Sequence, residues 1–228
     1  MSEADRILEE LRRREREVSA GFYDLDRPAN LFLRHGQERA LCKALEDSGL
    51  LPLAGRRILE VGCGSGNWLE ILERFGAEHL SGIELDPERA ARAADRFPGA
   101  DIRTGDASRL PWGDGGFDIV LQSTVFSSIL DPGMRKAVAS EMLRVLAPGG
   151  AILWYDFFMD NPSNPHVRGI RRREIAALFP GCRVVLRRAT LAPPLARRIV
   201  PVSWTLAALL ESLRVLDTHY LGVIRRAA

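Results

Sequence analysis

The stretch Ile58-Leu-Glu-Val-Gly-Cys-Gly-Ser-Gly-Asn-Trp68 decides the fold, because a short apolar run leads directly into a loop with three alternating glycines. Gly62, Gly64 and Gly66 let the backbone turn tightly and let a ligand approach without meeting a Cβ atom. An apolar strand before the loop and a helical pattern after it, at 66–75, are the context in which such a loop holds a nucleotide-like ligand. The stretch therefore predicts a strand, a binding loop and a helix.

Similar units follow along the chain. Strand and helix patterns alternate up to Asp156, and the strands are apolar along their whole length, which indicates a parallel sheet covered on both faces. Beyond Asp156 a Pro/Asn loop at 160–166 interrupts the pattern. The predicted strands are 57–61, 80–84, 117–122, 151–155, 182–191 and 218–225, and the predicted helices are 3–18, 31–50, 66–75, 87–97, 132–147, 171–179 and 203–216.

Three carboxylates follow the strands. Glu60 ends the first strand, where it would repel a pyrophosphate but suit an ammonium group. Glu84 ends the next, 18 residues after Gly66, where a carboxylate can accept both ribose hydroxyls. Asp106 can accept from an exocyclic amine. Ammonium, ribose and adenine amine together describe S-adenosylmethionine. Asp86 is the competing ribose acid, but it precedes Pro87 and is better explained as a helix N-cap.

The ordered segments ILEVGCGSGNW, GIELDP, GDASRLPW, FDIVLQSTVFSSI and RVLAPGGAILWYDF, over about residues 57–157, resemble the successive motifs of class I S-adenosylmethionine-dependent methyltransferases. The resemblance implies an α/β, Rossmann-like seven-stranded sheet with the last strand antiparallel and helices on both faces. It assigns Glu60 and the 62–66 loop to the methionine end, Glu84 to the ribose, and Asp106 with Ala107 to the adenine. The residues expected to bind S-adenosyl-L-methionine are Glu60, Gly62, Cys63, Gly64, Gly66, Asn67, Trp68, Glu84, Leu85, Asp106, Ala107 and Gln122, with no metal.

Some of these positions have a second interpretation. Trp68 and Trp112 can pack near the cofactor or in the core. Gln122, Thr124 and Ser127 can orient a substrate or satisfy the backbone at the strand end. An inactive relative of the family remains an alternative to an enzyme.

The predicted organisation is an N-terminal helical cap at 1–56 and a methyltransferase domain at 57–228, in which 157–216 include a substrate lid insertion. Residues 3–18 carry a thin apolar stripe that can rest on a domain surface. The helix at 31–50, which contains His35, is expected to cap the cofactor.

Methyl transfer to a hydroxyl requires a group that removes or shares a proton. Asp156 ranks first because it ends a strand at the carboxyl edge of the sheet, and His166, in the loop just beyond, ranks second. His35 and His219 also qualify by position. Each has a structural interpretation too, since a strand-end acid often caps a turn and a lone histidine is more often structural.

The charge distribution bears on the acceptor. Residues 1–167 carry 20 basic and 27 acidic side chains, and residues 168–228 carry 12 and 3. No DNA partner is expected and RNA is disfavoured, since the chain lacks an Asn/Asp-Pro-Pro-Tyr/Phe motif and has two lysines in all. The tail is similar to a bacterial subgroup associated with glycan or natural-product biosynthesis. We expect a small-molecule acceptor with a hydroxyl, and the arginines allow it to be anionic. An RNA methyltransferase and a non-catalytic cofactor-binding subunit are the alternatives.

The cellular setting is expected to be cytoplasmic. Three dispersed cysteines suit a reducing compartment, and the charged N-terminus is no signal peptide. The stretch from Ile199 to Leu210 is too short to span a bilayer, so no stable membrane insertion is expected. Residues 195–210, where arginines flank an apolar stretch with Trp204, fit a contact with a membrane surface.

Overall fold

A computed structural model describes residues 2–18, 21–161 and 164–227. Its centre is a seven-stranded sheet in the order β3-β2-β1-β4-β5-β7-β6, and β7 runs antiparallel to both neighbours. This confirms the predicted α/β fold, including the antiparallel last strand. The strands are β1 Arg57–Val61, β2 His79–Glu84, β3 Asp101–Thr104, β4 Phe117–Ser123, β5 Leu146–Phe157, β6 Cys182–Leu191 and β7 Asp217–Arg226.

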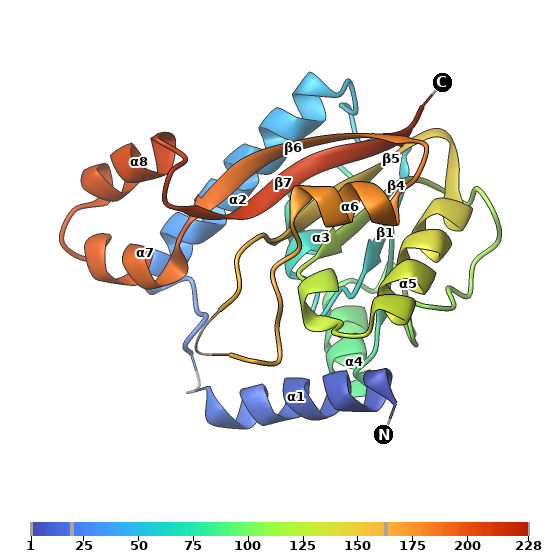
Figure 1. Ribbon diagram of the computed structural model, residues 1–228, viewed down its shortest axis with the longest axis horizontal. Helices are drawn as coiled ribbons and strands as arrows, with labels where there is room; N and C mark the ends of the chain where they lie inside the picture. Colours follow the sequence, from blue (N-terminus) through green and yellow to red (C-terminus); the bar gives the residue numbers. More distant parts are fainter. Residues whose placement is uncertain (1, 19–20, 162–163, 228) are drawn as a thin grey trace.

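Helices cover both faces of the sheet (Figure 1). Buried side chains of the second, third and fourth helices pack on one face, and those of the fifth and sixth pack on the other. The helices are α1 Glu3–Glu17, α2 Pro28–Asp47, α3 Asn67–Arg74, α4 Pro87–Arg96, α5 Pro132–Val145, α6 Arg172–Leu178, α7 Pro193–Ile199 and α8 Trp204–Ser212, with a 3-10 turn η1 at Phe126–Ser128.

The alternation of side chains along the central strands divides the core into two layers. Ile58 and Ile119 point to the face of α2 and α3, whereas Leu59 and Val120 point to the face of α5. All four are fully buried, and each such side chain contributes about 1.5–3 kcal/mol through the hydrophobic effect. This two-sided burial is why the strands are continuous apolar runs.

The predicted strands omit β3, which is a half-exposed edge strand without a continuous apolar run. Further differences between predicted and observed segments lie in the tail. Residues 193–199, expected only to lie in an insertion, form α7, whose proline start suits the first turn of a helix. α8 ends at Ser212 rather than at 216, and Arg214 then has a φ of 58°. Such a left-handed residue cannot continue a helix.

α7 and α8 lie at the carboxyl edge of the sheet. β6 is antiparallel to β7, which is antiparallel to β5, so β6 runs in the same direction as β5. The segment after β6 therefore begins at the edge where β1, β2 and β4 also end. A third apolar cluster joins it to α2, through Phe32, Ala196, Val200 and Ala207. No helix in the described ranges is long and apolar enough to cross a membrane.

Candidate active site

The loop after β1 has a shape that requires its glycines. Gly62, Gly64 and Gly66 have φ values of 69°, 57° and 87°, a region that side chains disfavour. A Cβ atom at Gly62 would lie 2.4 Å from Cγ2 of Val125, and one at Gly64 would lie 2.7 Å from a guanidinium nitrogen of Arg89. The glycines thus let the loop approach the end of β4 and the start of α4.

Glu60 lies beneath this loop with an unused acceptor. Its side chain is 1% exposed, and Oε2 has no hydrogen-bond partner among the residues that the structure describes. Burial, together with the neighbouring Glu84 carboxylate, raises the pKa of Glu60 well above its usual range. A buried carboxyl oxygen without a donor is costly, and an ammonium group of a ligand would supply the missing donor.

Glu84, at the end of β2, joins the loop to the next helix. Its Oε2 accepts from the Gly64 amide at 2.8 Å, and its Oε1 accepts from the Asp86 amide at 3.0 Å. A carboxylate has about four acceptor positions, so each oxygen can still accept from a ribose hydroxyl. Asp86 itself accepts from the amides of Glu88 and Arg89, which agrees with its interpretation as an N-cap.

A cavity of about 200 Å³ opens at the carboxyl edge of the sheet beside Glu84. Asp106 lies on its wall, where Oδ1 accepts from the Ser108 amide at 2.8 Å. Of the predicted binding residues, the wall holds Gly62, Glu84, Leu85, Asp106 and Ala107; the rest of the lining is Ile7, Leu11, Arg14, Ile83, Arg89, Gly105, Ser123, Thr124, Val125, Ser128, Ile129 and Met134.

The first helix contributes to the wall of this cavity, whereas none of the lining residues comes from the second helix, which the sequence analysis expects to cap the cofactor. Ile7 and Leu11 of the predicted apolar stripe face the cavity. His35, on α2, lies instead beside Trp204, with ring centroids 6.1 Å apart. The reason is that α2 buries Phe32 and Leu41 against the sheet and the insertion, and this leaves the short stripe of α1 to cover the strand ends.

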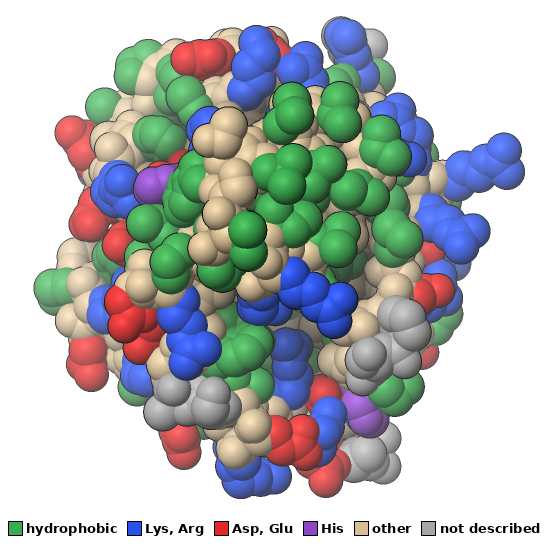
Figure 2. Space-filling model, turned by 90° about the vertical axis from the view of Figure 1, so that its left-hand side faces the viewer, with side chains coloured by type: hydrophobic (Ala, Val, Ile, Leu, Met, Phe, Trp, Pro, Cys, Tyr) green, Lys and Arg blue, Asp and Glu red, His purple; other side chains and the backbone are tan. Residues whose placement is uncertain are grey.

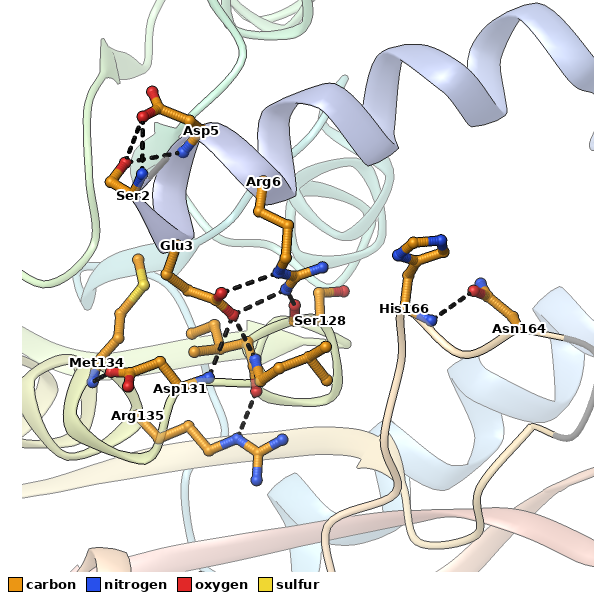
Figure 3. A network of polar contacts seen from close by, with 12 residues as sticks. Ser2, Glu3, Asp5, Arg6, Ser128, Asp131, Met134, Arg135, Asn164 and His166 are labelled. Atoms are coloured by element: carbon orange, nitrogen blue, oxygen red, sulfur yellow. Dashed lines mark hydrogen bonds and ion pairs between the residues drawn. The ribbon is translucent and has the colours of Figure 1, made fainter.

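Polar contacts hold α1 in place (Figure 3). The Glu3 carboxylate accepts from the amides of Leu130 and Asp131, and Arg6 donates to the Ser128 carbonyl at 2.6 Å. The Arg6 guanidinium, together with these two amides, holds the pKa of Glu3 at about 2, although partial burial opposes the shift. At the other end of the helix, Glu15 pairs with Arg92 of α4 at 2.7 Å.

Four of the predicted cofactor residues have other surroundings. Trp68 is buried against Tyr155, with ring centroids 5.0 Å apart. Cys63 is buried, and burial raises the pKa of its thiol. Asn67 is exposed and accepts from Arg96. Gln122 is fully buried and accepts from the Val125 amide at 3.2 Å, so it supports the turn after β4.

The two predicted proton acceptors also lie outside the cavity wall. Asp156 is fully buried, and its carboxylate accepts from the amides of Ser127 and Phe157 at 3.1 and 2.8 Å. Burial raises the pKa of Asp156 to about 6. His166 is partly exposed on the loop before α6, with Nε2 3.7 Å from a carboxylate oxygen of Glu10 on α1.

The other two histidines that qualified by position, His35 and His219, pack against aromatic rings. His219 is buried between the rings of Tyr155 and Phe157, at centroid distances of 4.7 and 4.0 Å. Burial lowers its pKa to about 3. The neutral ring of His219 is therefore its stable form.

Trp112, which was expected to pack near the cofactor or in the core, packs edge-on against Phe117 with ring centroids 5.5 Å apart.

Arg89 is a cavity residue that the sequence analysis missed. Its guanidinium lies over Gly64, and it sits in the first turn of the helix that Asp86 caps. The signal available in the sequence was a basic residue three positions after Asp86, the second of the two acids at the end of β2. A cation at this place can neutralise an anionic group of a ligand bound on the glycine loop.

These residues fit S-adenosylmethionine. Glu60 does not line the cavity, but at the end of β1 it offers an unpaired buried acceptor for the ammonium group. On the cavity wall, Arg89 offers a cation for the carboxylate and Glu84 offers free acceptor positions for the ribose. Asp106 has one oxygen, Oδ2, to which no described residue donates, for the adenine amine. No group of three or more His, Cys, Asp or Glu side chains in the described part of the chain could hold a metal ion.

Comparisons with known proteins agree with this geometry. The family described as a methyltransferase domain matches residues 58–150. A probable S-adenosylmethionine-dependent methyltransferase of Mycolicibacterium smegmatis is 32% identical over 134 residues, which are 55% of this chain and 51% of the relative. A phthiotriol/phenolphthiotriol dimycocerosates methyltransferase of Mycobacterium ulcerans is 36% identical over 117 residues, 50% of this chain and 41% of the relative. The chain thus spans about half the length of the curated relatives it matches.

Solved structures share the fold at low identity. An S-adenosylmethionine-dependent methyltransferase from Mesorhizobium loti superposes with a TM-score of 0.58 at 18% identity, over 82% of this chain and 98% of that one. The [4+2]-cyclase SpnF superposes with a TM-score of 0.61 at 20% identity, over 84% and 82%. These likenesses concern the fold alone.

Proposed function

Because the chain belongs to the class I S-adenosylmethionine-dependent methyltransferases, we propose that it methylates a small-molecule acceptor, most favourably at a hydroxyl of a glycan or natural-product intermediate. The observation that carries the proposal is the buried, unpaired Oε2 of Glu60 beside the glycine loop and Glu84. This arrangement leaves a buried acceptor unsatisfied unless a cationic ligand binds there.

The bound cofactor supplies an electrophilic methyl group on a sulfonium. The protein's own residues then have three tasks. Glu60, Glu84, Arg89 and Asp106 fix the cofactor at the strand ends, α1 excludes water from it, and the turn after β4 sets the direction from which an acceptor approaches. Alignment of the two reactants can supply a large part of the rate.

Asp156 and His166 remain our candidates for the group that accepts the hydroxyl proton. Burial places the pKa of Asp156 at about 6, which suits a general base near neutral pH. Its carboxylate also holds the Ser127 amide, so it supports the turn that carries Thr124 at the cavity. His166 contacts Glu10 of α1 and lies on the loop that follows β5.

Calorimetric titration with S-adenosylmethionine tests the cofactor site. Glu84→Ala removes the carboxylate that holds Gly64 and serves the ribose, so we expect affinity to fall by at least about tenfold. Asp95→Ala, an exposed acid on α4, is the matched control and should bind as the wild type does. Wild-type protein that binds no S-adenosylmethionine, or Glu84→Ala with unchanged affinity, would refute the proposal.

Turnover tests the proton acceptor separately. A screen of hydroxyl, amine and carbon acceptors, with detection of S-adenosylhomocysteine, identifies the reaction first. The turnover of Asp156→Asn and of His166→Gln is then compared with that of the wild type, after calorimetry has shown that each variant binds the cofactor with wild-type affinity. A variant with full turnover removes that residue from the mechanism.

Two further outcomes distinguish the alternatives. Cofactor binding without turnover on any acceptor supports a non-catalytic subunit. An affinity for RNA that falls steeply with salt supports an RNA methyltransferase, because each phosphate contact releases counterions. A small-molecule enzyme shows little such dependence.

A further inference from the structure

Residues 202–216 expose an unusual number of large apolar side chains. We call these side chains the α8 apolar face. On the helix itself, Leu206, Leu209 and the following Leu213 share one side. The face consists of Val202, Trp204, Leu206, Leu209, Leu213, Val215 and Leu216, with exposures of 86%, 39%, 46%, 59%, 61%, 70% and 38%. In Figure 2, which looks at the side of the molecule that carries α7 and α8 in Figure 1, hydrophobic side chains gather over the surface and Lys and Arg side chains lie at their margin.

Apart from Trp204, which packs edge-on against Phe32, the side chains of this face take no part in the apolar cluster that anchors α8. α8 is anchored by its other side, where Ala207 is fully buried and packs in the cluster of Phe32 and Val200. The outward side chains therefore remain in water although the helix is already held. Contiguous exposed apolar surface of this kind marks a site of interaction.

The charges around the face are positive. Between residues 193 and 216 the basic side chains are Arg197, Arg198 and Arg214, and the acid is Glu211. Glu211 is 6% exposed and paired with Arg39 of α2. The exposed charges of this segment are thus cations.

A basic groove borders the same segment. It has a volume of about 900 Å³, lies between α2 and the strands β6 and β7, and shares Glu211 and Arg214 with the segment of α8. Its floor includes apolar side chains such as Val185 and Leu221. Its charged lining is Arg39, Lys43, Asp47, Arg183, Arg187, Arg188, Glu211, Arg214 and Arg225.

We propose that the α8 apolar face and its arginine margin dock on the surface of an anionic phospholipid bilayer. An interfacial helix places its apolar side chains in the headgroup boundary, while arginines at the margin meet anionic headgroups. Trp204, at the start of α8, packs edge-on against Phe32 with ring centroids 5.2 Å apart, and its exposed part has the ring type that favours this boundary. Since no described helix can cross a membrane, the contact is peripheral.

Other occupants fit the observations less well. A nucleic acid would engage the arginines but leave seven large apolar side chains in water. A second copy of the chain, packed symmetrically on this face, would bring its own arginine margin against the first, and like charges repel. An anionic bilayer satisfies both the apolar and the cationic parts.

Vesicle flotation with purified protein tests the proposal. We expect binding to vesicles of equal parts phosphatidylcholine and phosphatidylglycerol to exceed binding to pure phosphatidylcholine by about tenfold. The double variant Val202→Glu with Leu213→Glu should reduce binding by at least about tenfold. Ala91→Glu with Ala94→Glu adds the same charge to exposed positions of α4, at the opposite end of the sheet, and should change binding by less than about twofold.

Three results would overturn the proposal. The first is absence of wild-type binding to the anionic vesicles. The second is an equal loss of vesicle binding in both double variants, which would mean that the added negative charge reduces binding wherever it lies on the molecule. The third is a dimer by light scattering that Val202→Glu with Leu213→Glu dissociates. Circular dichroism checks that each variant is folded, and because the readout is binding, the result is independent of methyl transfer.

Discussion

At the scale of single residues, burial has given two titratable groups near the ends of β5 and β7 opposite effects on stability. His219 has a pKa of about 3, so the unfolded chain, whose histidines titrate near 6.5, takes up the proton first. The contribution of His219 to the free energy of unfolding is therefore present above about pH 6.5 and is lost as the pH falls towards 3. Asp156 has a pKa raised to about 6, so the folded state keeps a proton that the unfolded chain releases. The contribution of Asp156 to the free energy of unfolding therefore falls as the pH rises from about 4 to 6.

Replacement of His219 isolates the first of these effects. His219→Phe keeps an aromatic ring between Tyr155 and Phe157 but cannot take up a proton. The wild type should lose about 2 kcal/mol from this group between pH 6.5 and pH 5, and the variant should not. Urea denaturation at several pH values measures the difference. Parallel stability curves for the two proteins below pH 6.5 would contradict the assignment.

At the scale of elements, α1 is held by a narrow apolar stripe of Ile7 and Leu11 and by polar contacts at both of its ends. Ile7 is buried against the cavity, but the contacts that fix the two ends of the helix are Glu3 with the 130–131 amides and Glu15 with Arg92. Such contacts contribute little each and weaken with salt. We therefore expect α1 to open more readily than the helices that pack on the sheet.

Glu3→Gln tests this expectation. It keeps the size of the side chain but removes the charge that Arg6 and two amides contact, so cofactor should dissociate about two- to fivefold faster. Glu9→Gln, at an exposed position of the same helix, is the matched control. Stopped-flow release of S-adenosylhomocysteine measures the rates. Equal rates for both variants would show that the Glu3 contacts do not hold the helix closed over the ligand.

At the scale of the whole molecule, the sheet brings the candidate binding residues together at one edge. Glu60, Glu84 and Asp106 come from or follow three neighbouring parallel strands, β1, β2 and β3. The fold by itself is compatible with different chemistry, since the [4+2]-cyclase SpnF shares it. The fold thus provides a place for a ligand, and the side chains at that place decide the reaction.

Ligand binding should accordingly stabilise the molecule and protect one edge of it. S-adenosylmethionine at about 100 times its Kd should raise the free energy of unfolding by about 2.7 kcal/mol. Hydrogen exchange should slow in the glycine loop 62–66, around Glu84 and in α1, and should stay unchanged in β6. Thermal unfolding and exchange mass spectrometry measure both effects. Protection centred on the basic groove instead would place the ligand elsewhere.

The part of the candidate site that depends on local spacing could be predicted from the sequence. The glycine loop, Glu84 and Asp106 each follow a strand within a few residues, and parallel strands bring their carboxyl ends to one edge. The surroundings of Gln122 and Trp68 could not be predicted from local spacing. Both were predicted to bind the cofactor, yet Gln122 accepts from the amide of the turn after β4 and Trp68 packs on Tyr155. Neighbours in sequence point to opposite faces of a strand and to different sides of a helix.

The sequence by itself indicated the alternation of strands and helices and the acids at the strand ends, because apolar periodicity and glycine conformation are local properties. The seven strands and the antiparallel last strand were implied by the resemblance to the family. The tertiary structure decided that α1 and not α2 lines the cavity, that Arg89 joins it, that Asp156 is enclosed, and that one side of α8 remains in water. These outcomes depend on competition between segments far apart in the chain. Each helix buries its most apolar side. Which side chains stay exposed or unpaired is decided only when all the segments have packed together.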